Sequence, residues 1–276
     1  MTHAGVKPWV GDIAAEVIAT SRAGRQVQPF SKRYAGFSFA EAYEVAQRVQ
    51  DIRVANGETV IGRKIGFTNR AVWDSYGLSA PIWGYMYNST VRHLSSVNTG
   101  FPLAGLAEPR IEPEIILRIA NSPHPDMSDD ALVECIDWVA HGFEIVQSIF
   151  PSWVFTPADA VAAQGVHVAL LIGQRHPLSP DRRLWDDLLS NFKVELIRDE
   201  KMMTSGHGHD VLGGPLQALR FLVEALAHRP ASEALRPGEI VTTGTLTQAL
   251  PIAPGETWTT VLTGIEIEGL QVRFEN

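Results

Sequence analysis

The sequence contains only one cysteine, Cys135, among its 276 residues, so no disulfide can form within the chain. It also lacks any apolar run long enough to cross a membrane as a helix. The first seven residues have no apolar segment of the kind found in secretion signals. We therefore expect a cytoplasmic protein without a membrane partner, in which Cys135 packs in the core of a reduced protein.

An excess of positive charge is also absent. The formal net charge is −8, and no run of basic residues interrupts the chain, so we expect no nucleic-acid partner. An apolar content of 45% and a charged content of 20% are ordinary for a soluble globular protein. No Gly-x-Ser-x-Gly sequence is present, and this disfavours a serine hydrolase of the α/β-hydrolase type.

Two parts of the chain differ in their apolar pattern. Apolar residues recur at helical spacing from about residue 9 to 55, with Ser38 as a helix cap. From about residue 59, strand-like runs alternate with glycine and proline. The predicted strands cover residues 59–67, 110–119, 142–148, 166–172, 192–198, 239–245 and, in pieces, 257–274. Helices are predicted at 128–140 and 215–227. The fold class is therefore α+β, with a mixed β-rich core at 59–276 and an N-terminal helical subdomain at 1–58.

Two carboxylates lie inside the most strand-like run. Glu112 and Glu114 are separated by one residue, so a strand presents both side chains on the same face. Two neighbouring anions on a half-buried face repel each other and are costly to desolvate. A hard divalent cation removes both penalties, whereas an edge strand with its polar face in water explains the same pattern without a metal.

A third carboxylate favours the metal. Glu144 stands alone in another strand-like apolar run, and a buried glutamate needs a basic partner or a metal. Three glutamates without a cysteine or histidine cluster favour Mg²⁺ or Mn²⁺ over zinc. We therefore predict that Glu112, Glu114 and Glu144 are the metal ligands.

Five motifs carry a family resemblance, which are PRIEPEI at 109–115, FEIV at 143–146, GRKIGFT at 62–68, LGGPL at 212–216 and LRPGEIVTTG at 235–244. With these motifs the sequence resembles the fumarylacetoacetate hydrolase superfamily. Within it, the chain is most similar to the 2-keto-4-pentenoate (2-hydroxypenta-2,4-dienoate) hydratases and the 4-oxalocrotonate decarboxylases. The resemblance implies the rolled β-sheet core of that superfamily and covers nearly the whole chain.

The resemblance also implies site residues. It places the active-site lysine of the family on Lys64, which a strand would present between Gly62 and Gly66; a surface lysine is the alternative. It matches Asp159 to an aspartate of the hydratases, which would orient a partner or a water molecule. Lys64 and Asp159 are therefore the predicted catalytic residues.

Substrate contacts are predicted at four further residues, which are Gln164, His167, Leu212 and Thr243. The segment from Asp159 to His167 departs from the usual hydratase pattern, because alanine, glutamine and valine occupy 163, 164 and 166. His167 is either an acid/base near neutral pH or a hydrogen-bonded core histidine.

The predicted activity is that of a divalent-metal lyase. The enzyme would hydrate a 2-hydroxy-2,4-dienoate or 2-oxo-enoate to a 4-hydroxy-2-oxo acid, as in aromatic meta-cleavage catabolism, with the metal stabilising negative charge on the C2 oxygen. The alternatives are a 4-oxalocrotonate-type decarboxylase, a C–C hydrolase of an acylpyruvate, and a non-catalytic assembly subunit of the same fold. The expected partner is a small-molecule acid, and we expect a homo-oligomer.

Overall fold

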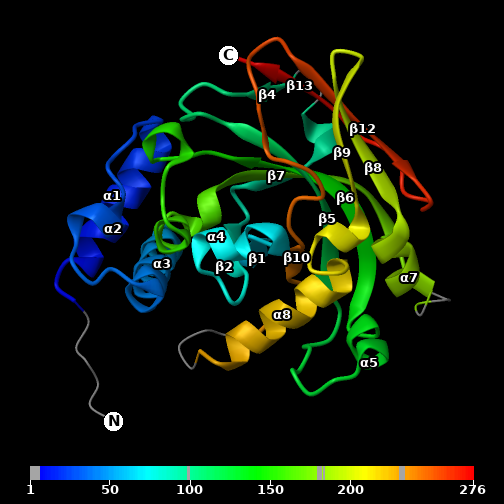
Figure 1. The fold of residues 1–276 in the computed structure, drawn as a ribbon, viewed down its shortest axis with the longest axis horizontal. Helices are drawn as coiled ribbons and strands as arrows, with labels where there is room; N and C mark the ends of the chain where they lie inside the picture. Colours follow the sequence, from blue (N-terminus) through cyan, green and yellow to red (C-terminus); the bar gives the residue numbers. More distant parts are fainter. Residues whose placement is uncertain (1–6, 98–99, 179–181, 183, 230–233) are drawn as a thin grey trace.

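The computed structural model describes residues 7–97, 100–178, 182, 184–229 and 234–276. Within these ranges, two β-sheets pack against each other and helices surround them (Figure 1). The larger, eight-stranded sheet runs in the order β2-β1-β10-β5-β6-β7-β3, and β11 pairs with β5 outside this path. The smaller, five-stranded sheet has the order β4-β13-β12-β8-β9.

The strands of the larger sheet are β1 (Val60–Gly66), β2 (Ile82–Tyr87), β3 (Val91–His93), β5 (Arg110–Ile119), β6 (Ile136–Val146), β7 (His167–Pro177), β10 (Ile240–Thr242) and β11 (Leu250–Pro251). Those of the smaller sheet are β4 (Phe101–Pro102), β8 (Lys193–Arg198), β9 (Lys201–His207), β12 (Thr257–Thr263) and β13 (Gln271–Glu275). The α-helices are α1 (Val10–Ala23), α2 (Phe30–Arg33), α3 (Phe39–Ala55), α4 (Trp73–Tyr76), α5 (Asp129–Val133), α6 (Pro157–Ala162), α7 (Leu184–Asn191) and α8 (Pro215–Ala227). None of the helices in the described ranges is long and apolar enough to cross a membrane.

An apolar core joins the two sheets. Ile111 of β5, Phe143 of β6 and Leu171 of β7 belong to one buried cluster with Trp258 of β12 and Phe274 of β13. Successive strand residues point to opposite faces, so the even-numbered residues of β5 lie on the face turned away from this core. The larger sheet curls around that second face (Figure 1), which is the concave face of the sheet.

Side chains of two kinds divide the concave face. A small apolar cluster fills one end, and it includes Ile116 of β5, Leu170 of β7 and Ile240 of β10. The carboxylates occupy the other end, because Glu112 and Glu114 share a face with Ile116. The curl of the sheet therefore encloses a polar site next to an apolar wall.

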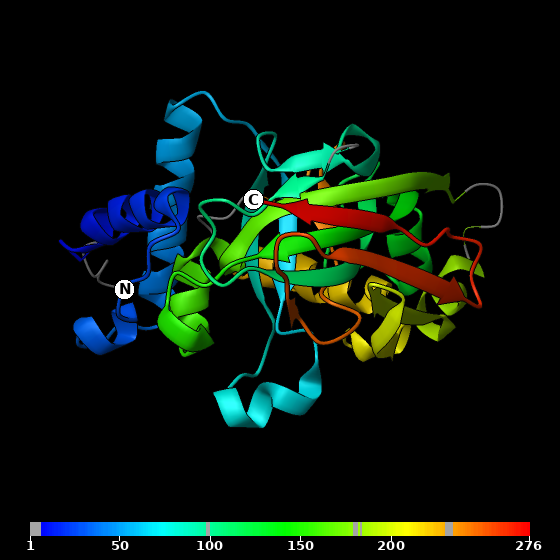
Figure 2. The ribbon, with the colours of Figure 1, turned by 90° about the horizontal axis from the view of Figure 1, so that it is seen from above.

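Helices α1 to α3 stand beside the sheets (Figure 2) and pack on α6. Helix α3 begins with a capping box in which Ser38 and Glu41 bond each other's backbone, so the predicted cap at Ser38 is confirmed. Apolar residues of these helices share one buried cluster with Val161 of α6. The division into parts at residues 58 and 59 stays a prediction, and residues 1–6 of the first part lie outside the described residues.

Asp159 ties α6 to α2. Its carboxylate accepts hydrogen bonds from the backbone N–H and the hydroxyl of Ser31, at 2.8 and 2.6 Å. It also accepts from the backbone N–H and the hydroxyl of Thr156, at 2.9 and 2.7 Å, and so closes the capping box of α6. These four bonds account for the complete burial of this carboxylate.

The helix predicted at 128–140 is wrong over its second half. Ser128 caps a helix as predicted, but α5 ends at Val133 and residues from Ile136 onward belong to β6. Ile136 and Val139 pair with β5 in register, which satisfies the backbone of β6 and buries both side chains. Cys135 consequently lies between α5 and β6 rather than on a helix, and it is buried, as predicted for core packing.

We predict that Asp159→Ala lowers the free energy of unfolding by roughly 2–4 kcal/mol, because it removes a helix cap and leaves buried donors without an acceptor. Urea denaturation measures the loss. Ser31→Ala, which removes only one hydroxyl donor, should cost about 1 kcal/mol. Equal stability of Asp159→Ala and the parent protein would contradict this role.

Candidate metal centre

Three glutamates meet on the concave face. Glu112 and Glu114 of β5 and Glu144 of β6 each offer a carboxylate oxygen within 4.8 Å of the others. Strand pairing produces this arrangement, because Glu112 lies directly opposite Glu144 in the β5–β6 register. Glu114 and Glu144 are completely buried, and Glu112 is partly buried.

One oxygen of each buried carboxylate is already bound. The backbone N–H of Gly244 donates to Glu114 Oε2 at 2.8 Å. The ring nitrogen Nδ1 of His167 lies 2.7 Å from Glu144 Oε1. Among the described residues, the buried atom Glu114 Oε1 accepts no hydrogen bond from a donor group. Glu144 Oε2 lies 3.3 Å from the Lys64 ammonium, and the carboxyls of Glu144 and Glu114 lie beside each other. These two remaining oxygens, with Glu112, fit the oxygen-ligand preference of a hard divalent cation.

The pKa values of the three carboxyls show how costly this arrangement is in the protein alone. Burial, followed by the repulsion from Glu144, raises the pKa of Glu114 well above its usual range. Burial also raises the pKa of Glu112, to about 7. Burial acts in the same direction on Glu144, but the charge of Lys64 and the hydrogen bond from His167 outweigh it and lower the pKa of Glu144. The triad therefore holds protons as well as negative charge. A bound cation would displace the protons and neutralise the charge.

Lys64 lies beside the triad and is 3% exposed. Burial alone lowers the pKa of this lysine, but attraction to Glu144, Glu112 and Glu114 outweighs burial and raises it. The alternative of a surface lysine is therefore wrong. Gly165 lets the stem of Lys64 pass close to the backbone, because a Cβ added to Gly165 would lie 2.7 Å from Lys64 Cδ.

Not all of the other predicted site residues contact the three glutamates or Lys64. The amide of Gln164 accepts from the Tyr87 hydroxyl at 3.2 Å and donates to the carbonyl of Ala46 on α3, so it is engaged with that helix. Thr243 donates both its hydroxyl and its N–H to the carbonyl of Ile115, each at 3.1 Å. Substrate contacts of Gln164 and Thr243 stay predictions without support from these bonds.

Leu212 and Asp159 are similarly engaged elsewhere. Leu212 is buried in the core cluster next to α8, and its N–H donates to the carbonyl of Thr68 at 3.1 Å. Both oxygens of Asp159 are taken by Ser31 and Thr156. Neither residue has a contact with the triad among the described hydrogen bonds, so the roles predicted for Leu212 and Asp159 also stay untested predictions.

Three groups that the sequence analysis missed lie at the site. Gly244 holds Glu114 through its backbone N–H, and Thr90 contacts His167. Thr242 of β10 pairs in register with Lys64 of β1 and with Ile116 of β5, so its side chain is on the concave face. Its buried hydroxyl has no hydrogen-bond partner among the described residues. In the sequence, only the GEIVTTG motif pointed to this part of the site, and it did not identify which of its threonines faces the triad.

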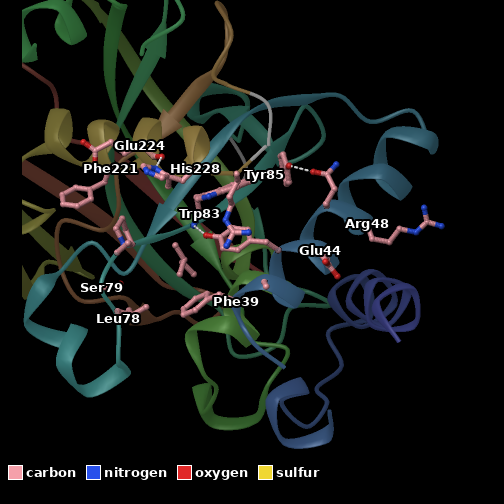
Figure 3. A pocket seen from close by; sticks show the side chains of 18 of the residues that line it. Phe39, Glu44, Arg48, Leu78, Ser79, Trp83, Tyr85, Phe221, Glu224 and His228 are labelled. Carbon is pink, nitrogen blue, oxygen red and sulfur yellow. Dashed lines mark hydrogen bonds between the residues drawn. The ribbon is translucent and has the colours of Figure 1, made fainter. Parts of the chain in front are cut away.

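A large groove of the described surface lies elsewhere. It has a volume of about 1230 Å³ between α3, α8 and β2, and Figure 3 shows Trp83, Tyr85 and His228 on its walls. Trp83 and Tyr85 alternate with Gly84, which is the register partner of Lys64, so they lie on the opposite face of the sheet. None of the predicted site residues lines this groove.

Comparisons with known proteins agree with the architecture. A 2-keto-4-pentenoate hydratase from Paraburkholderia phymatum is 30% identical to the chain over 225 residues, which cover 81% of this chain and 82% of that protein. The chain belongs to the 2-keto-4-pentenoate hydratase family. A second member, a 2-hydroxyhexa-2,4-dienoate hydratase from Comamonas testosteroni, is 27% identical over 247 residues, covering 88% and 90% of the two chains.

A solved structure shares the fold. The 4-oxalocrotonate decarboxylase from Pseudomonas putida G7, complexed with magnesium and adipate, superposes with a TM-score of 0.86 over 96% of this chain and 97% of that one, at 24% identity. The predicted rolled-sheet core of the fumarylacetoacetate hydrolase type is thereby confirmed, and more distant members of that superfamily share it. No protein-family model matches the chain.

We predict that divalent-metal affinity rises with pH through about 7. Below that pH, Glu112, whose pKa lies near 7, is protonated, and the proton must leave before the carboxylate can bind a cation. The raised pKa of Glu114 extends the rise to higher pH. Titration calorimetry of Mn²⁺ at pH 6.0, 6.5 and 7.0 should show up to about a tenfold change per pH unit for each proton released.

The control variant is Glu112→Gln, which binds more weakly but has lost the titrating group. Its affinity should depend less steeply on pH than that of the parent protein. An affinity of the parent protein that does not change between pH 6 and 7 would contradict the proton competition.

Proposed function

We propose that this protein is a divalent-metal-dependent hydratase. Its substrate would be a 2-hydroxy-2,4-dienoate or 2-oxo-enoate and its product a 4-hydroxy-2-oxo acid, formed during aromatic meta-cleavage catabolism. The observation that supports this most is the triad with two oriented carboxylate oxygens, in a chain whose family members are named as hydratases of such acids. A cytoplasmic location and a homo-oligomeric state belong to the same proposal. The free thiol of Cys135 fits the reducing conditions of the cytoplasm.

Glu112, Glu114 and Glu144 would hold Mg²⁺ or Mn²⁺. Both ions prefer oxygen ligands, and the triad contains no sulfur or nitrogen donor. When bound, the cation supplies Lewis-acid stabilisation of negative charge on the 2-oxygen of the substrate. The rest of the chemistry depends on the residues around the triad.

Lys64 acts as a charged group and not as a base. Its raised pKa keeps the proton on Nζ at neutral pH. A buried ammonium next to the metal ligands attracts the carboxylate of an incoming acid, and it can donate a hydrogen bond to it. The catalytic role proposed for Lys64 is therefore to hold the substrate carboxylate and to retain a proton next to it.

Thr242 offers an uncommitted hydrogen-bonding group on the face of the sheet that carries the triad. Its buried hydroxyl faces the same side of the sheet as Lys64 and has no partner among the described residues. A buried hydroxyl without a partner is destabilising, so a polar atom of the substrate or a water molecule is its natural partner. We propose that Thr242, and not Thr243, contacts the substrate.

A second candidate function is decarboxylation of an oxalocrotonate-type diacid. Arg110 favours it, because this residue shares the concave face of β5 with Glu112 and Glu114. Its guanidinium carbon Cζ lies 4.1 Å from the centroid of the Trp153 ring. Its buried Nε has no hydrogen-bond partner among the described residues. A second substrate carboxylate would give Arg110 a partner that a mono-acid cannot supply.

We predict that Glu114→Gln weakens Mn²⁺ binding by roughly two orders of magnitude and lowers kcat at least as much. The glutamine can still accept the hydrogen bond from Gly244, so the fold should be kept. The metal-free variant should melt at a higher temperature at neutral pH, because the cost of burying the Glu114 carboxyl beside Glu144, which its raised pKa expresses, is gone. Unchanged calorimetric Mn²⁺ affinity in both Glu112→Gln and Glu114→Gln would contradict the ligand assignment.

We predict that Lys64→Met lowers kcat/KM by about 100-fold or more, because the ammonium interacts with the substrate. Mn²⁺ affinity should not fall, since lysine is not a ligand and its charge repels cations. Lys64→Arg, which keeps the charge in a longer side chain, serves as the matched control and should recover part of the activity. Activity of Lys64→Met within twofold of the parent enzyme would contradict this role.

The reaction itself is tested by supplying 2-hydroxypenta-2,4-dienoate and 4-oxalocrotonate separately with Mn²⁺. A hydratase consumes the dienoate without releasing CO₂, and a decarboxylase releases CO₂ from the diacid. In the decarboxylase case, Arg110→Met should raise KM for the diacid by about tenfold or more and leave KM for the mono-acid unchanged. No turnover of either acid, with acylpyruvate cleavage instead, would identify the C–C hydrolase.

A further inference from the structure

His167 connects a metal-ligand candidate to a distant turn. Its side chain is 2% exposed, and its Nδ1 lies 2.7 Å from Glu144 Oε1. Its other ring nitrogen, Nε2, lies 2.9 Å from the hydroxyl of Thr90, in the turn between β2 and β3. A carboxylate that binds a cation can only accept hydrogen bonds, so Nδ1 must carry the proton of the first bond.

The backbone before His167 is strained in a way that fixes this geometry. Gln164, Gly165 and Val166 all have positive φ angles, of 59°, 65° and 61°. Glycine adopts this conformation readily, but a β-branched valine does so at a cost of roughly 1–3 kcal/mol. The turn places Gly165 under the stem of Lys64 and starts β7 at His167. The strained turn therefore sets the start of β7 at His167 and leaves room for the stem of Lys64.

The two contacts of Glu144 divide its oxygens. His167 Nδ1 forms a hydrogen bond with Oε1, whereas the Lys64 ammonium lies 3.3 Å from Oε2. A free carboxylate can turn about its terminal bond and present either oxygen. A hydrogen bond to one oxygen removes that freedom and leaves the other aimed at the triad.

We infer that His167 is a positioning residue that fixes Glu144 Oε1, so that Oε2 is presented to the divalent cation, and that Thr90 in turn fixes the imidazole ring. This inference rests on the proposed function, because it assumes that Glu144 is a ligand. It differs from the substrate contact that we predicted for His167, since both ring nitrogens already have partners within the chain.

Three variants of His167 separate the donor from the bulk of the ring. Asparagine can place an N–H near the position of Nδ1, glutamine places its amide farther out, near Nε2, and leucine fills the space without a donor. We expect His167→Gln and His167→Leu to weaken Mn²⁺ binding to the metal-free protein by about 10- to 100-fold. His167→Asn should stay within about threefold of the parent protein, as rescue by the conservative variant.

Two further variants serve as controls. Thr90→Val removes the partner of Nε2 and should weaken Mn²⁺ binding less than His167→Leu does. His141 is another buried histidine, but it bonds the backbone carbonyl of Glu114 and the hydroxyl of Thr260 and not a carboxylate. His141→Gln should lower the melting temperature and leave Mn²⁺ affinity within about threefold, which separates positioning from general loss of stability.

Titration calorimetry with Mn²⁺ and steady-state kinetics give the outcomes. Weakened Mn²⁺ binding in the glutamine and leucine variants, with rescue by asparagine, supports the inference. Parent-like Mn²⁺ affinity in all three variants overturns it, and an increased KM at unchanged Mn²⁺ affinity overturns it in favour of a substrate contact. A parent protein that binds no Mn²⁺ at all contradicts the proposed function itself, so the two failures are distinguishable.

Discussion

Repulsion among three carboxylates at one end of a curled sheet is the constraint around which this site is organised. Glu114 and Glu144 are completely buried, and burial raises the pKa of Glu112 and of Glu114. The neighbouring groups each reduce that repulsion. Lys64 supplies a buried positive charge, and the N–H groups of Gly244 and His167 each hold one carboxylate oxygen. The chain thus stabilises an arrangement that a divalent cation, as proposed above, would complete.

The fold supplies this arrangement through strand register. Pairing of β5 with β6 places Glu112 opposite Glu144, and a shift of one residue would turn the carboxylates toward the apolar core. The core between the sheets, which contains Phe143 and Trp258, penalises any such shift. The packing that stabilises the fold therefore also fixes the position of the candidate ligands.

Local patterns predicted the parts of the site that lie within one strand. The alternation in residues 110–119 correctly placed Glu112 and Glu114 on one face of β5, and the same run matches the strand end to end. Contacts between distant segments were not predictable in this way. The partners Thr90 and Gly244 lie far from the triad in sequence, and only the paired strands show that Thr242 faces the site. The helical spacing of Ile136 and Val139 led to a wrong helix prediction, because pairing with β5 makes this segment a strand.

We propose that one divalent cation binds between Glu112, Glu114 Oε1 and Glu144 Oε2. Anomalous diffraction from crystals grown with Mn²⁺ tests it most directly, because the scattering of manganese locates the ion without reference to activity. We expect one strong peak at about 2.0–2.4 Å from Glu114 Oε1 and Glu144 Oε2, with a Glu112 oxygen as a further ligand. We also expect Gly244 and His167 still to hold the other two oxygens. A peak elsewhere, or ligation through the oxygens that Gly244 and His167 now hold, would contradict it.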